Sequence, residues 1–102
     1  MAVNLQRVRE HLRTCELESL FIEELGWDKP AGGPLTIPVD GDTFTLTPVA
    51  DKRGFTVFLC VNAHGSIPPR ATRMRLDKET RKHRHEHMIV YTDARRQTQV
   101  WQ

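Results

Sequence analysis

A dense run of basic residues between positions 70 and 84 is the strongest chemical signal in this sequence. Seven Lys and Arg side chains fall there, against only two acidic ones, Asp77 and Glu79. Guanidinium groups pair with phosphate oxygens through two parallel hydrogen bonds, so such a run is typical of a surface that binds a polyanion. A solvated helix face without a ligand gives the same pattern. The residues that we predict to contact the DNA backbone, with two flanking turns included, are Lys52, Arg53, Arg70, Arg73, Arg75, Lys78, Arg81, Lys82, Arg84, Arg95 and Arg96.

Charge is divided unevenly between the two halves of the chain. Residues 1–51 hold four Lys/Arg and nine Asp/Glu, which gives a net charge of −5. Residues 52–102 hold eleven Lys/Arg and four Asp/Glu, which gives a net charge of +7. Such an asymmetry favours a nucleic-acid partner or an acidic protein partner. A module that docks against neighbouring domains through its acidic and basic halves is therefore the alternative to DNA contact.

Three histidines, His83, His85 and His87, alternate along the chain after the basic run. In an extended strand their imidazoles would point to one side, which is a possible geometry for a metal site. Lys82 and Arg84 lie beside them and would repel a cation. We therefore predict no physiological metal site at these residues.

Nuclease chemistry of the restriction-endonuclease kind needs an acidic residue at a strand start and an acid-x-Lys pattern on the next strand, which together hold Mg²⁺. The strand expected over residues 55–61 contains neither an acid nor a lysine, and Asp51-Lys52 before it has the wrong spacing. We predict no catalytic residue in this chain. A metal-dependent nuclease domain remains a further alternative.

The elements expected to position the basic run begin with two short helices. Asn4 can cap the first and Thr14 the second, whose apolar face is Leu17, Leu20, Phe21 and Leu25. Gly26 then occupies the position that follows a helix end. Asp40-Gly41 is a strong turn signal and predicts a hairpin of strands 36–39 and 43–47.

The second half alternates between strand and helix patterns. Residues 55–61 are apolar enough for a central strand buried on both faces. A helix over about 70–84 follows two prolines, with Met74 and Ala71 facing the sheet. Strands over 88–92 and 98–101 complete an α+β domain of two N-terminal helices, a β-meander, a basic crossover helix and a final strand pair. This order resembles a degenerate restriction-endonuclease-like core.

Length and composition indicate one soluble domain spanning residues 1–102. No apolar run approaches the roughly 20 residues that span a bilayer, and no signal peptide is recognisable, so we expect a cytoplasmic protein that does not contact a membrane. Cys15 and Cys60 read as buried free thiols. Trp27 and Trp101 read as packing residues. An apolar strand close to the last residue suggests a segment excised from a longer protein.

Four short blocks carry a family resemblance: LFIEELGWD at 20–28, KRGF at 52–55, HEHMIVYTD at 85–93 and QVWQ at 99–102. They resemble the extreme N-terminal region of large bacterial restriction–modification proteins of the type IIG kind. The resemblance implies a parent that binds DNA, methylates adenine with S-adenosylmethionine and cleaves DNA with Mg²⁺. No methyltransferase motif lies in these residues, so the resemblance implies no cofactor in this segment. Its expected partners are the DNA backbone and the downstream domains of the same protein.

Overall fold

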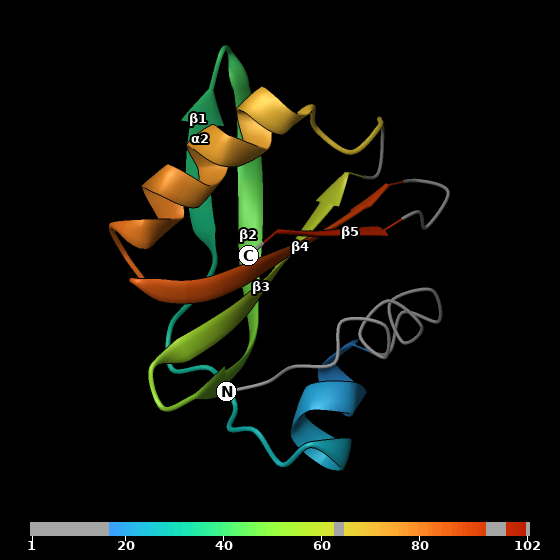
Figure 1. Cartoon of the computed structure of the whole chain (residues 1–102), viewed down its shortest axis with the longest axis vertical. Helices are drawn as coiled ribbons and strands as arrows, with labels where there is room; N and C mark the ends of the chain where they lie inside the picture. The colour runs from blue at the N-terminus through green and yellow to red at the C-terminus, as the bar shows by residue number, and fades with distance from the viewer. Residues whose placement is uncertain (1–16, 63–64, 94–97, 102) are drawn as a thin grey trace.

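The fold is built on one mixed β-sheet in which the strands lie in sequence order, β1-β2-β3-β4-β5 (Figure 1). The computed structural model describes residues 17–62, 65–93 and 98–101, the last of these for the backbone only. Its elements are η1 (Ser19–Glu24), β1 (Leu35–Val39), β2 (Asp42–Lys52), β3 (Phe55–Asn62), α2 (Arg70–Arg81), β4 (Glu86–Asp93) and β5 (Thr98–Trp101).

Strands β1, β2 and β3 form an antiparallel meander, and α2 then crosses over so that β4 pairs with β3 in parallel. A parallel pair needs such a crossover, because a tight turn can join only antiparallel neighbours. In the parallel register, Phe55 lies opposite Glu86 and Asn62 opposite Asp93. The turn after β2 and the chain that enters β4 are therefore at the same end of the sheet.

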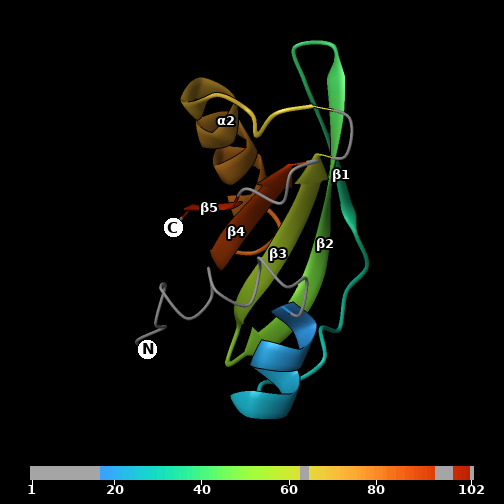
Figure 2. The same ribbon diagram turned by 90° about the vertical axis from the view of Figure 1, so that its right-hand side faces the viewer.

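The two helices cover opposite faces of the sheet, as the strand periodicity requires. Val57 packs in a cluster with Leu20 and Phe21 of η1, whereas its neighbour Phe58 packs in a second cluster with Leu76 of α2. Adjacent residues of a strand point to opposite faces, so the sheet separates the two clusters. Figure 2 shows α2 near one end of the sheet and η1 near the other.

The tight turns adopt the conformations expected from their residues. Asp40 and Gly41 have φ of 52° and 86° at the tip of the β1–β2 hairpin, as a turn with two left-handed residues requires. Gly26, with φ of 71°, ends the η1 segment. The predicted hairpin, central strand and crossover helix are confirmed, and the protein is a small α+β domain with one main helix.

Two details differ from the sequence-based expectations, and a third expectation is not tested. The first predicted helix, and the caps Asn4 and Thr14, lie outside the described residues. Leu25 was expected on the buried face of the second helix but is exposed, because the helix widens to a π-helix and ends there. Met74, with 51% of its surface exposed, and Ala71 face solvent instead of the sheet.

Candidate DNA-backbone interface

Helix α2 and its C-terminal cap residue, Lys82, carry six of the eleven predicted contact residues. Pro69 precedes the helix in an extended conformation, which sets the helix start without a side-chain cap. Lys78 and Arg81 occupy the last turn, where positive charge is favourable near the carbonyl end of a helix. The dipole therefore favours the charge of the last turn, whereas it opposes the positive charge of Arg70 and Arg73 in the first turn.

One side of α2 packs on the sheet, and this side contains the residues that sequence reasoning missed. Leu76 and Thr80 are fully buried, and the Thr80 hydroxyl donates a hydrogen bond to the Leu76 carbonyl oxygen at 2.7 Å. Asp77 is buried beside them. Because only one leucine anchors this side, the apolar pattern of the sequence did not distinguish it from the side that carries Met74.

The opposite side of α2, continued by its C-terminal cap residue, is lined with exposed basic residues. Every charged side chain on it is a cation, since Asp77 is buried and Glu79 is half-buried at the margin. We call this surface the cationic face; it consists of Arg70, Arg75, Lys78, Arg81 and Lys82.

Two residues of the cationic face form exposed ion pairs. Arg75 contacts Asp40 of the β1–β2 turn at 2.6 Å, and Lys82 contacts Glu79 at 3.0 Å. Exposed pairs of this kind contribute roughly 0–1 kcal/mol to stability. Both cations can therefore exchange these partners for phosphate oxygens at little cost.

Arg73 does not belong to the cationic face. It is half-buried, its Nε is enclosed, and its charge acts on Tyr91 in the core. Burial raises the pKa of Tyr91, and the nearby Arg73 guanidinium partly opposes that rise. Arg73 therefore faces the sheet side of α2.

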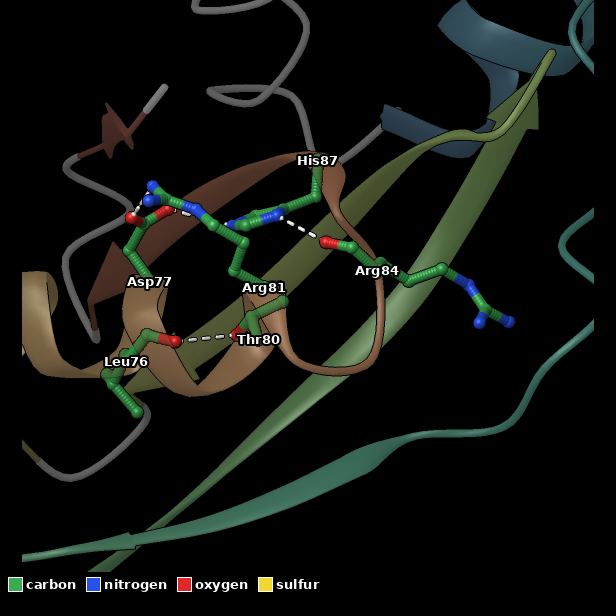
Figure 3. A network of polar contacts seen from close by, with 6 residues as sticks. All are labelled: Leu76, Asp77, Thr80, Arg81, Arg84 and His87. Carbon is green, nitrogen blue, oxygen red and sulfur yellow. Dashed lines mark hydrogen bonds and ion pairs between the residues drawn. The ribbon is translucent and has the colours of Figure 1, made fainter.

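Arg84 points away from α2, toward the loop before β1 (Figure 3). Its Nη1 donates to the His83 carbonyl oxygen at 3.0 Å. A Cβ placed on Gly32 would lie 3.0 Å from the Arg84 Nη2, so the glycine permits the close approach of this guanidinium. Arg84 lies beside a small cleft of about 150 Å³ whose floor includes Phe58.

The remaining predicted contacts lie on two turns. Lys52 is half-buried and Arg53 is exposed at the turn between β2 and β3. This turn is at the sheet end where β4 begins, which is the end to which the C-terminus of α2 leads. Arg95 and Arg96 lie outside the described residues.

The most constrained part of the site is a polar network between α2 and β4 (Figure 3). His87 Nε2 lies 2.8 Å from Asp77 Oδ1, and His87 Nδ1 lies 2.9 Å from the Arg84 carbonyl oxygen. Arg81 Nη2 donates to Asp77 Oδ2 at 2.5 Å. The His87 side chain is 3% exposed, Asp77 11% and Arg81 56%, so the network runs from the core to the surface.

The three alternating histidines are not brought together. His83 and His85 are exposed around the turn that follows α2, whereas His87 is buried against Phe58 with a ring separation of 6.3 Å. Within the described residues, no group of three or more metal-ligating side chains could hold an ion. Strand β3 carries only Thr, Cys and Asn as polar residues, so it offers neither a carboxylate nor a lysine.

The other singled-out residues lie in the core. Cys60 is a buried free thiol, and burial raises its pKa to about 11. Trp27 packs edge-on against Phe21 and Phe55, with ring centroids 4.7 Å and 5.9 Å away. Cys15 and the side chain of Trp101 lie outside the described part of the chain.

A larger cleft of about 530 Å³ lies at the other end of α2. The residues that line it include Phe44, Ile67 and Thr72, with Asp40 and Asp42 among the polar ones. Two carboxylates at this cleft oppose anion binding. It therefore does not extend the cationic face.

Acidic residues gather on the side of the sheet that α2 does not cover. Glu18, Glu23, Glu24 and Asp28 are exposed on and around η1. Because η1 and α2 pack on opposite faces of the sheet, the unequal charge of the two chain halves becomes an electrostatic polarity across the domain.

Comparisons with known proteins add no family assignment to this geometry. No family model, no curated protein and no solved structure matches the chain. Within the described residues, no helix has the length and apolar character required to cross a membrane.

Proposed function

We propose that this domain is a non-catalytic module that contacts the phosphate backbone of duplex DNA through the cationic face of α2. The observation that carries the proposal is the composition of that face, where five exposed cations outnumber the two accessible carboxylates at its margins, Asp40 and Glu79. A row of cations releases counterions from DNA when it neutralises phosphates, which supplies affinity without sequence specificity.

The electrostatic polarity of the domain supports the same orientation. The acidic side chains around η1 would be directed away from a duplex that lies along α2. Such an arrangement steers the approach of a polyanion as well as its final position. Lys52 and Arg53 at the β2–β3 turn follow Asp51, whose backbone pairs with that of Asp28, so they lie beside the acidic segment and should contribute less to the contact than the cationic face.

Fluorescence anisotropy with a labelled duplex of mixed sequence tests the proposal. We expect binding at low salt that weakens steeply with added salt, with a slope of log K against log salt of roughly −0.9 for each phosphate engaged. The charge reversal Lys78→Glu should weaken binding and make the slope shallower. Lys29→Glu is the matched control, because Lys29 is exposed outside α2 and should have a smaller effect.

Two results would refute DNA contact through α2. One is the absence of binding at low salt. The other is an equal loss of affinity in Lys78→Glu and Lys29→Glu, since the attraction would then depend on net charge alone.

The restriction–modification parent is the biological setting that we propose for this module. The element order, with a helix, a meander, a crossover helix and a strand parallel to β3, is compatible with a degenerate restriction-endonuclease-like core. In such a cytoplasmic parent, S-adenosylmethionine and Mg²⁺ would be bound by other domains. The sequence beyond this chain tests the setting, because a downstream adenine-methyltransferase motif is expected there.

Docking to another domain of the parent is the second candidate, and the acidic side around η1 favours it. A basic surface on a neighbouring domain would complement Glu18, Glu23 and Asp28. Glu23→Lys should weaken binding of an isolated downstream domain while leaving DNA affinity no lower than in the wild type. Equal capture of that domain by the variant and the wild type would exclude docking through this side.

A further inference from the structure

Arg81 differs from Arg75 and Lys82 of the cationic face because it is held by a carboxylate that is itself buried. Its Nη2 donates to Asp77 Oδ2 at 2.5 Å, and the Asp77 side chain is 11% exposed. The partners of Arg75 and Lys82 are the more exposed carboxylates of Asp40 and Glu79. Arg81 therefore combines an outward position with a fixed attachment to the core.

Asp77 is in turn held by His87. The imidazole Nε2 lies 2.8 Å from Asp77 Oδ1, and the Nδ1 lies 2.9 Å from the Arg84 carbonyl oxygen. Both of these partners are hydrogen-bond acceptors, so each ring nitrogen of His87 is held in place by one polar contact. The other neighbour of the ring is the uncharged Phe58 of β3, at an edge-on angle.

The Arg81–Asp77 pair presents its positive end to a phosphate ligand, because the carboxylate lies on the buried side of the guanidinium. The exposed end is the Arg81 guanidinium, which is 56% accessible and has donors left beyond the bond to Asp77.

We propose that Arg81 is a preset contact for a single DNA phosphate and that Asp77 and His87 are the residues that position it. The inference rests on the proposed function. It adds positioning roles for Asp77 and His87, which the surface charge alone does not indicate. A guanidinium already fixed in one orientation loses less side-chain freedom when phosphate binds. The phosphate would accept hydrogen bonds from the donors of Arg81 that face solvent.

A double-mutant cycle on DNA affinity tests the positioning roles. Arg81→Ala should lower affinity for the duplex about fivefold to tenfold at low salt, because a charge-assisted hydrogen bond and a counterion-releasing contact are lost. His87→Gln should lower it by a similar or smaller factor. The double variant should bind no more weakly than Arg81→Ala, since His87 acts only through Arg81.

Lys78 provides the matched control for the cycle. It lies on the same face next to Asp77 in the chain, and its side chain is not among the polar partners of Asp77 and His87. The fold losses in DNA affinity caused by Lys78→Ala and by His87→Gln should multiply in the double variant. Coupling of His87 to Lys78 as strong as to Arg81 would indicate a general loosening of α2 and would overturn the proposal. An Arg81→Ala variant that binds DNA as tightly as the wild type would also overturn the role of Arg81. The proposed function would remain intact in that case, because the other cations of the face would still bind the duplex.

A measurement on the unmutated protein covers the case in which His87→Gln does not fold. Nitrogen-15 NMR should show slow rotation of the Arg81 guanidinium. Titration with the duplex should shift the Arg81 side-chain signals, whereas inorganic phosphate at equal ionic strength should shift them less. A freely rotating Arg81 would refute the preset contact, and failure of the wild type to bind DNA would remove this inference together with the proposed function.

Discussion

His87 and Asp77, ten residues apart in the chain, meet in the interior through a hydrogen bond of 2.8 Å between Nε2 and Oδ1. The contact joins the start of β4 to the second half of α2, and both side chains are almost completely enclosed. It therefore fixes how the crossover helix lies on the sheet. Since the cationic face is the other side of the same helix, the buried pair also determines where the cations point.

Replacement of His87 should destabilise the domain even without DNA. His87→Gln leaves a buried Asp77 oxygen and the Arg84 carbonyl oxygen with incomplete hydrogen bonds, which costs roughly 1–3 kcal/mol in free energy of unfolding. Urea denaturation followed by circular dichroism measures the change. His85→Gln is the control and should be close to neutral, because His85 is exposed; an equal effect of the two variants would contradict the structural role of His87.

Leu76 should be the most sensitive apolar residue of α2. It is fully buried in the cluster with Phe58 and Ile89, so Leu76→Ala removes packing and leaves a cavity at a cost of about 2–5 kcal/mol. Met74→Ala, on the exposed side of the same helix, should cost less than about 1 kcal/mol. The midpoints of thermal unfolding of the two variants compare these effects directly, and the reverse order would mean that α2 packs with its other side inward.

Cys60 should be unreactive in the folded protein and should make stability fall at alkaline pH. Burial raises its pKa from 9.0 to about 11, so between these values the unfolded chain loses the thiol proton while the folded chain keeps it. The favourable contribution is complete below pH 9 and is lost as the pH rises toward about 11.

Two measurements check this expectation in a Cys15→Ser background. A thiol reagent at pH 8 should modify Cys60 only after denaturant is added. Between pH 9 and 11, the unfolding midpoint should fall more in the protein that contains Cys60 than in its Cys60→Ala variant. Parallel pH curves for the two proteins would show that the thiol does not titrate differently in the two states.

The β1–β2 turn should not tolerate a side chain at Gly41. Gly41 has φ of 86°, which is strained for any residue with a Cβ although nothing lies within 4 Å of that position. Gly41→Ala should therefore cost about 1 kcal/mol in unfolding free energy. Gly65→Ala is the control, because Gly65 has equal space and no positive φ, and a similar cost at both positions would refute backbone strain as the cause.

Local signals in the sequence were sufficient for the strands and turns. Asp40-Gly41 and Gly26 require backbone conformations that few other residues adopt, and the apolar run of β3 has no alternative to burial on both faces. The charge asymmetry was equally visible, because net charge needs no fold to be counted.

Tertiary structure alone decided which side of α2 faces inward and which cations share a surface. Met74 and Leu76 are both apolar and lie on opposite sides of the helix, so the sequence did not indicate which of them is buried. The outcome depends on contacts with distant segments, above all with β1 and with His87 of β4. The sequence by itself determined that this protein has a strongly basic helix. Packing of that helix against β1 and β4 turned Arg73 inward and left Arg70, Lys78 and Arg81 on the surface.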